Sequence, residues 1–232
     1  TVQITVLAFP STALAGPDQN LCDVTTTQMA AKVPVVGTGS WSQLSGPNTA
    51  VLADATLATT VVSGLVPGSY AFTWATSNGI CPGNKDTVLI NVSTPGPNAN
   101  AGPDQQLCNV TSTTLAGNNA TPGTGTWTQI AGPNTALIVN AANPSTALQN
   151  LVPGNYQLVW TIRNGACATT ADTVQIVIVA PPSDADAGPD QTKYNNGLFV
   201  MNANSPTSGT GKWLLISGAG TIADPNNPNT TI

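Results

Sequence analysis

The chain has 232 residues and a formal net charge of −5; only 6% of its residues are charged, none is histidine, and every acidic residue is an aspartate. General acid–base catalysis needs histidine, or carboxylates that the fold pairs, so this composition argues against an enzyme and we expect no cofactor. The basic residues are scattered, which excludes a basic patch for nucleic acid. They are Lys32, Lys85, Arg163, Lys193 and Lys212.

The N-terminal residues look like the end of a repeat. Residues 1–8, TVQITVLA, align with residues 87–94 and 173–180. We therefore predict that residues 1–9 are the last strand of a preceding repeat and that the first residue is not a natural N-terminus. No signal peptide is recognisable, and no apolar run approaches the ~20 residues of a membrane span.

A repeat of 86 residues organises the rest of the chain. The stretch LVPGSYAFTWATSNGIC at 65–81 returns as LVPGNYQLVWTIRNGAC at 151–167, and the pentapeptide AGPDQ begins at residues 15, 101 and 187. Spacing that stays constant indicates tandem domains. We predict repeats over 10–95 and 96–181 and an incomplete repeat over 182–232, joined by proline-containing, semi-rigid spacers.

Each repeat begins with elements that are short and separated by turns. The Gly-Pro-Asp of AGPDQ is expected to end the first edge strand. A second strand is expected at 113–118, with a counterpart at 199–204, and a short one at 147–148. A Gly-Thr-Gly bend then leads into a strand that carries a tryptophan, which we interpret as a core residue. The three tryptophans are Trp41, Trp127 and Trp213.

The clearest strand follows the Pro153-Gly154 turn. Its apolar residues alternate with polar ones, which is typical of a half-buried strand. Asn164-Gly165 then predicts a tight hairpin. With about seven short strands per repeat and a turn every eight to twelve residues, the sequence predicts an all-β sandwich. The aromatic residues predicted to point into the core from this strand and its counterpart are Tyr70, Trp74, Tyr156 and Trp160.

Four cysteines occupy equivalent places, 59 residues apart in each repeat. We interpret them as disulfides within a repeat, Cys22–Cys81 and Cys108–Cys167. The alternative is metal ligation, which would need further ligands, and the chain has neither histidine nor a C-x-x-C motif. Disulfides imply an oxidising, extracytoplasmic location. Tyr194 stands at the first cysteine position of the third repeat.

These motifs together resemble those of a known family. The order AGPDQ-x-x-C, GTGxW, L-x-PGxYxxxW, NGxC and DTVxIxV is similar to polycystic-kidney-disease (PKD) repeats. More narrowly, it resembles the cysteine-bearing repeats of giant secreted Bacteroidetes proteins, such as gliding-motility adhesins exported by type IX secretion. The resemblance implies seven-stranded immunoglobulin-like sandwiches in an elongated array at the cell surface, with no catalytic residues. The tyrosine after each Pro-Gly turn also resembles the tyrosine corner of such sandwiches.

Two further kinds of site are hypotheses. The carboxylates of Asp184, Asp186 and Asp190 cluster near the second junction and suit Ca²⁺, with turn chemistry as the alternative. Thr87 and Thr173 lie in Asp-Thr-Val triplets, a pattern that Bacteroidetes use for O-glycosylation, with plain strand chemistry as the alternative.

Three functions are compatible with this sequence. The first is a structural stalk of a long surface adhesin, whose partners are the neighbouring repeats, with surface polysaccharide or the secretion and motility machinery as further candidates. The second is a polysaccharide-binding module of a secreted enzyme, which the inward positions of most aromatic residues disfavour. The third is a filament or sheath assembled by lateral contacts between chains.

Overall fold

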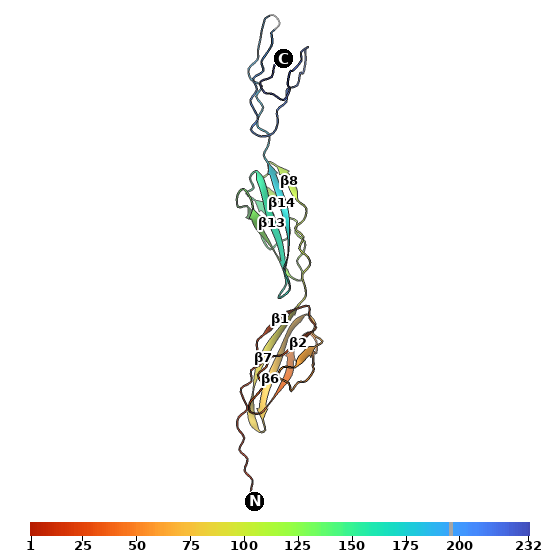
Figure 1. The fold of residues 1–232 in the computed structure, drawn as a ribbon, viewed down its shortest axis with the longest axis vertical. Helices are drawn as coiled ribbons and strands as arrows, with labels where there is room; N and C mark the ends of the chain where they lie inside the picture. Colours follow the sequence, from red (N-terminus) through yellow and green to blue (C-terminus); the bar gives the residue numbers. More distant parts are fainter. Residues whose placement is uncertain (195–196) are drawn as a thin grey trace.

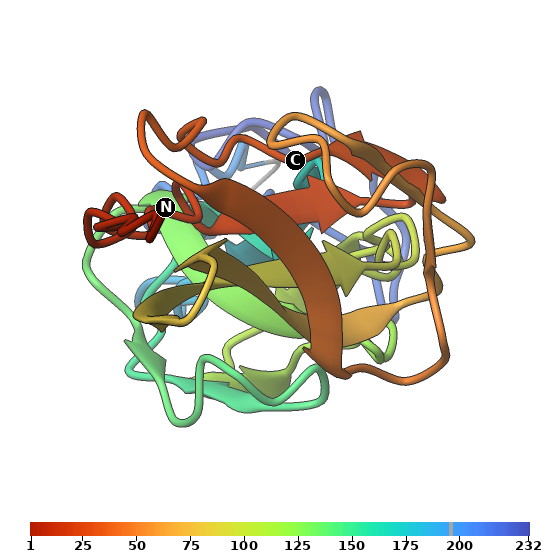
Figure 2. The ribbon, with the colours of Figure 1, turned by 90° about the horizontal axis from the view of Figure 1, so that it is seen from below.

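The structure is a computed structural model that describes every residue of the chain except 195 and 196. All the regular secondary structure in the described residues is β-strand, as the sequence predicted. Two units that carry the strands, and then a segment with almost none, follow one another along the long axis, with the termini at opposite ends (Figure 1). Seen along that axis, these parts project onto one another (Figure 2).

The first unit consists of two sheets. In spatial order, the larger sheet contains β1 (Gln19–Cys22), β7 (Cys81–Ser93), β6 (Gly68–Asn78) and β3 (Thr38–Ser45). The smaller sheet contains β2 (Thr26–Gln28), β5 (Val61–Ser63) and β4 (Val51–Leu52). The strand β1 runs parallel to β7, so Cys22 lies opposite Ser93 where both strands end. The other neighbouring strands of the unit are antiparallel.

The second unit has the same topology. Its larger sheet contains β8 (Gln105–Cys108), β14 (Thr170–Val179), β13 (Gly154–Arg163) and β10 (Thr124–Ala131). Its smaller sheet contains β9 (Ser112–Thr114), β12 (Ala147–Gln149) and β11 (Leu137–Ile138). The strand β8 again runs parallel to β14, with Cys108 opposite Val179. The repeat in the sequence is therefore a repeat of the whole fold.

Each unit has its own hydrophobic core. One core is built from residues between 13 and 92, and the other from residues between 99 and 178. On β13, Tyr156, Leu158, Trp160 and Ile162 are at most 1% exposed, because the strand alternates between core and solvent. Burying a large apolar side chain contributes about 1.5–3 kcal/mol, so this alternation fixes which face of the strand turns inward.

A pair of tryptophans fills the middle of each core. The ring centroids of Trp41 and Trp74 are 5.1 Å apart, and those of Trp127 and Trp160 are 5.0 Å apart. The second tryptophan packs directly on the glycine that precedes the first by two residues. A Cβ on Gly125 would lie 2.1 Å from Cζ2 of Trp160. The second glycine of the GTGxW motif is therefore required for the packing of the tryptophan pair.

The expected tyrosine corner forms in both units. The hydroxyl of Tyr70 accepts a hydrogen bond from the Val66 N–H at 2.8 Å and also contacts the Asn48 side chain. The hydroxyl of Tyr156 accepts from the Val152 N–H at the same distance. Both rings are buried. Each hydroxyl provides a hydrogen-bond acceptor for a backbone N–H in the turn that precedes its strand.

The aspartates that recur in each repeat hold backbone in place. The Asp18 carboxylate accepts from the Leu89 N–H at 2.8 Å, and that of Asp104 accepts from the Gln175 N–H at 2.7 Å. Asp172 accepts from the Ala101 N–H at 2.8 Å. These contacts tie the AGPDQ segment to the last long strand of its unit. The segment does not end a first edge strand as predicted, because β1 begins at Gln19, the last residue of the pentapeptide. Residues 1–18 contain no strand, so the strand predicted at residues 1–9 is not formed either.

The C-terminal segment keeps part of this framework without forming sheets. Its described residues contain one isolated bridge, Val200–Thr231, so the strand predicted at 199–204 is not formed. Backbone contacts equivalent to those of the complete units remain. The Asn204 N–H donates to the Asp186 oxygen at 3.0 Å, as the Asn118 N–H donates to the Asn100 oxygen at 2.9 Å.

We predict that Gly125→Ala destabilises the second unit by about 1–3 kcal/mol, because the new methyl group cannot fit against Trp160. Thermal unfolding followed by tryptophan fluorescence measures the change. Gly211, at the equivalent position of the C-terminal segment, is the matched control, since a Cβ there would have no neighbour closer than 3.9 Å. Equal melting temperatures for the two variants would contradict this account.

A second prediction concerns the indole N–H of Trp74, which is buried and has no hydrogen-bond partner in the part of the chain that the structure describes. Its counterpart in Trp160 donates to the side-chain oxygen of Asn118 at 3.1 Å. The residue equivalent to Asn118 in the first unit is Lys32. We expect Lys32→Asn to supply the missing acceptor and to raise the free energy of unfolding by about 1 kcal/mol.

Denaturant unfolding measures this gain. Lys32→Ala is the control, because it removes the lysine without adding an acceptor. Equal stabilisation by both substitutions would show that loss of the lysine, and not the new hydrogen bond, is responsible.

Candidate functional site

The residues with the most distinctive chemistry meet where the first unit joins the second. The parallel strands β1 and β7 end there together, with Cys22 beside Ser93. The turn between β13 and β14 approaches the same place from the second unit (Figure 1). Gly165 allows this turn to close, since its φ of 52° lies in the left-handed region that favours glycine.

A disulfide joins the two units across this junction. The Sγ atoms of Cys22 and Cys167 are 2.07 Å apart, and their Cα atoms are 4.9 Å apart, within the usual range for a disulfide. The bond closes a sequence separation of 145 residues. In the chain-entropy model, closing a loop of that length stabilises the folded state by about 5 kcal/mol.

The predicted pairs Cys22–Cys81 and Cys108–Cys167 are therefore wrong. The reason is strand direction. Cys81 is the first residue of β7, whereas Cys22 lies opposite its last residue. At about 3.3 Å per residue, the two ends of this strand are ~40 Å apart, far beyond the reach of a disulfide. Cys108 and Cys167 are separated in the same way along β14.

Close packing accompanies the covalent bond. The Asn164 side chain donates to the Thr94 carbonyl oxygen at 2.8 Å. The Cys167 Sγ lies 3.5 Å from the Ser93 carbonyl oxygen. A Cβ on Gly165 would lie 1.9 Å from the Ser93 Oγ, so the turn has room only for glycine. Sequence reasoning did not identify Ser93 and Thr94 as residues of the junction. The available signal was their constant distance in sequence from the Asn164-Gly165 turn.

The spacer between the units is fastened to the second unit rather than free. The Ala99 N–H donates to the Thr170 hydroxyl at 3.0 Å, and that hydroxyl donates to the Pro97 carbonyl at 3.2 Å. Asn118 donates from its side-chain amide to the Asn98 carbonyl at 2.9 Å. The proline-containing spacer therefore has little freedom to bend independently of the domain that follows it.

The same contacts occur where the N-terminal residues meet the first unit. The Asn78 side chain donates to the Ala8 carbonyl at 2.8 Å, as Asn164 does to Thr94. The Cys81 Sγ lies 3.8 Å from the Leu7 carbonyl oxygen. Residues 7 and 8 thus take the place, relative to the β6–β7 turn, that residues 93 and 94 take relative to the β13–β14 turn.

The other sites proposed from the sequence are distributed along the chain. The described residues contain no group of three His, Cys, Asp or Glu side chains that could hold a metal ion, so the calcium hypothesis for Asp184, Asp186 and Asp190 finds no support. Instead, the Asp186 carboxylate accepts from the Gly188 N–H at 2.8 Å, which is turn chemistry. Thr87 and Thr173 are both exposed on long strands.

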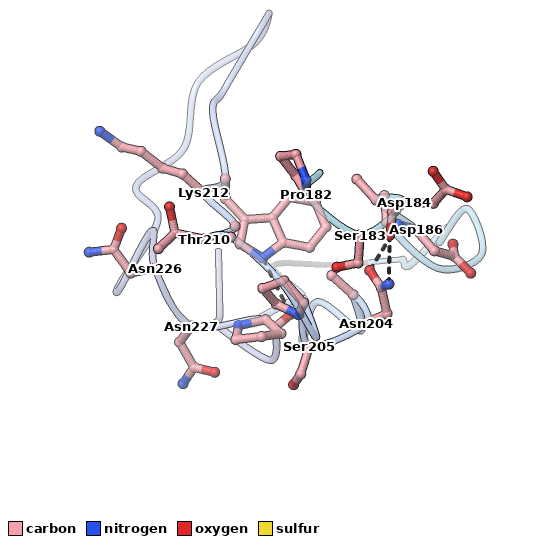
Figure 3. Close-up of a pocket in the computed structure, with 18 of the residues that line it drawn as sticks. Pro182, Ser183, Asp184, Asp186, Asn204, Ser205, Thr210, Lys212, Asn226 and Asn227 are labelled. Carbon is pink, nitrogen blue, oxygen red and sulfur yellow. Dashed lines mark hydrogen bonds between the residues drawn. The ribbon is translucent and has the colours of Figure 1, made fainter. Parts of the chain in front are cut away.

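The core tryptophan predicted in the third repeat has a different environment from its counterparts. Trp213 is only partly buried and lines a cavity of about 720 Å³ between Pro182, Asn204 and Asn227 (Figure 3). In the complete units, the equivalent ring packs on Trp74 or Trp160. The cavity is therefore core space that no second tryptophan fills.

Comparison with known proteins finds a family match over the second unit. Residues 101–178 match the family profile described as "K319L-like, PKD domain". Over 82 residues, 34% of this chain, the sequence is 37% identical to the dyslexia-associated protein KIAA0319 homolog of Mus musculus. The matched stretch is 8% of the mouse protein, so the chain corresponds to a small part of that relative.

Solved structures are similar in fold over most of the chain. A three-immunoglobulin fragment of titin has a TM-score of 0.54 and 14% identity, over 97% of this chain and 87% of the fragment. Immunoglobulin domains 1–5 of Sidekick-1 have a TM-score of 0.53 and 11% identity, over 90% of this chain and 47% of that one. The described residues include no helix long and apolar enough to cross a lipid bilayer. The chain has an all-β, immunoglobulin-like fold, and its residues 101–178 are similar to PKD domains.

Proposed function

We propose that this chain is a structural segment of an extracellular adhesion-type protein, in which PKD-type units in series act as a stiff stalk. The observation that carries the proposal is the Cys22–Cys167 disulfide between successive units. A bond in that position does not complete either core. It restrains one unit against the next, which is the requirement of a spacer that must resist bending.

The fastened spacer supports the same function. Its backbone is hydrogen-bonded to Thr170 and Asn118, so the spacer is not a flexible linker. A disulfide also favours an oxidising compartment outside the cytoplasm. Module families of this PKD and immunoglobulin type are typically non-catalytic, in agreement with a mechanical role.

The narrower proposal is a gliding-motility or attachment adhesin of Bacteroidetes, exported by type IX secretion. It rests on the order of repeat motifs in the sequence. The partners we propose are the neighbouring repeats, and beyond them surface polysaccharide or the secretion and motility machinery.

Small-angle scattering tests the stalk. A compact chain of this length would have a radius of gyration of about 17 Å. Units arranged in series should give about twice that value for the oxidised monomer. Cys22→Ser should keep folded units but add bending between them, seen as a rise in the high-angle region of the Kratky plot. A radius near 17 Å would reject the stalk.

The proposed Bacteroidetes origin predicts O-linked sugar on Thr87 and Thr173, which are exposed and follow an aspartate. Intact mass of the protein from its native source should exceed that of the bare polypeptide, and Thr87→Ala with Thr173→Ala should remove the excess. A native mass equal to the polypeptide would argue against glycosylation.

A further inference from the structure

Two cysteines remain unpaired after the Cys22–Cys167 bond is formed. Cys81 is partly buried and Cys108 is exposed. They cannot bond to each other, because Cys81 lies at the end of its unit away from the junction and Cys108 lies at the far end of the next unit. Each nevertheless stands at a repeat position whose counterpart is bonded.

The setting of Cys108 is the same as that of Cys22. Both end a strand that runs parallel to the last long strand of the unit. The residue after each cysteine has a positive φ, 48° for Asp23 and 51° for Asn109. The Asp23 N–H donates to Ser93 at 2.9 Å, and the Asn109 N–H donates to Val179 at 3.0 Å. The thiol of Cys108 therefore lies at the C-terminal end of its strand in the second unit, as that of Cys22 does in the first unit.

The setting of Cys81 is the same as that of Cys167. Each follows an Asn-Gly turn whose asparagine side chain donates, at 2.8 Å, to a backbone oxygen of the preceding segment. Each Sγ lies close to a backbone oxygen of that segment, Leu7 for Cys81 and Ser93 for Cys167. In the bonded junction, the residue beside Ser93 is Cys22. The position beside Leu7 is therefore where a preceding repeat would place its own β1 cysteine.

We propose that Cys81 and Cys108 are the open ends of a disulfide ladder, in which the β1 cysteine of each repeat bonds the turn cysteine of the next. This inference rests on the proposed array of repeats. Cys108 takes the turn cysteine of a complete repeat that follows it, and Cys81 takes the β1 cysteine of a complete repeat that precedes it. In each bond two thiols lose two protons and two electrons, which pass to the disulfide of a thiol–disulfide oxidoreductase and reduce it to a dithiol.

Tyr194 gives the ladder a direction and an end. It occupies the β1 cysteine position of the third repeat and its side chain is 92% exposed. A third repeat with a turn cysteine could use that cysteine to bond Cys108. Because it has Tyr194 in place of a β1 cysteine, it could not bond the turn cysteine of the next repeat. The junction after it would lack this bond and would bend more.

The test extends the chain and counts free thiols. A copy of residues 101–186 inserted between residues 186 and 187 supplies a complete repeat after the second unit. Non-reducing peptide mapping should link Cys108 to the copied Cys167, with loss of Cys108 alkylation, and the copied Cys108 should become the new free thiol. The same insertion with Cys108→Tyr, which imitates Tyr194, should leave the copied Cys167 free.

A second extension makes the test independent of how that insertion folds. A copy of residues 9–86 placed before residue 1 supplies a complete repeat in which residues 1–8 take the place that residues 87–94 have in the first unit. Cys81 should then lose its reactivity and bond the copied Cys22. Each extended chain should contain two free thiols, as the present chain does.

Bonds within repeats would leave no free thiol and would overturn the proposal. Persistent alkylation of both Cys81 and Cys108 in the extended chains would also overturn it. An elongated scattering profile combined with either result would reject the ladder and leave the stalk standing, whereas a compact profile would reject the stalk itself.

Discussion

The parallel pairing of β1 with β7, repeated in β8 and β14, is the constraint on which the rest of the structure depends. Because the two strands run in the same direction, the cysteine that ends β1 lies at the end of the unit that faces the next unit. The turn cysteine, at the start of the last long strand, lies at the opposite end of the unit. Each unit therefore presents one cysteine at either end.

This placement changes what the disulfide does. Within a small sandwich, a disulfide usually compensates for a core too small to be stable alone. Here each core is already closed by its tryptophan pair and its tyrosine corner. Under tension along the chain, the bond would transfer load from Cys22 directly to Cys167 and bypass the chain between them, a sequence separation of 145. Its contribution is thus to the relation between units.

Local features were predictable from the sequence because their causes are local. Alternation with period two placed Tyr156 and Trp160 inside, and the Pro-Gly turn set the tyrosine corner. The cysteine pairing was not predictable in the same way. Equivalent positions in a repeat are equally compatible with bonds inside a repeat and bonds to the next, and only strand direction distinguishes them. The strand predicted at 199–204 is the counterpart of β2 and β9, which pair with β5 and β12 in the first two units. In the described C-terminal segment, the single bridge between Val200 and Thr231 stands in place of that pairing.

Peptide mapping of the oxidised 232-residue chain under non-reducing conditions tests the central claim most directly. After alkylation of free thiols, the account predicts one cross-linked species that joins the peptides of Cys22 and Cys167, with Cys81 and Cys108 both alkylated. Cross-links of Cys22 to Cys81 and of Cys108 to Cys167 would contradict it, because they would place both bonds inside the repeats and leave the junction without a covalent tie.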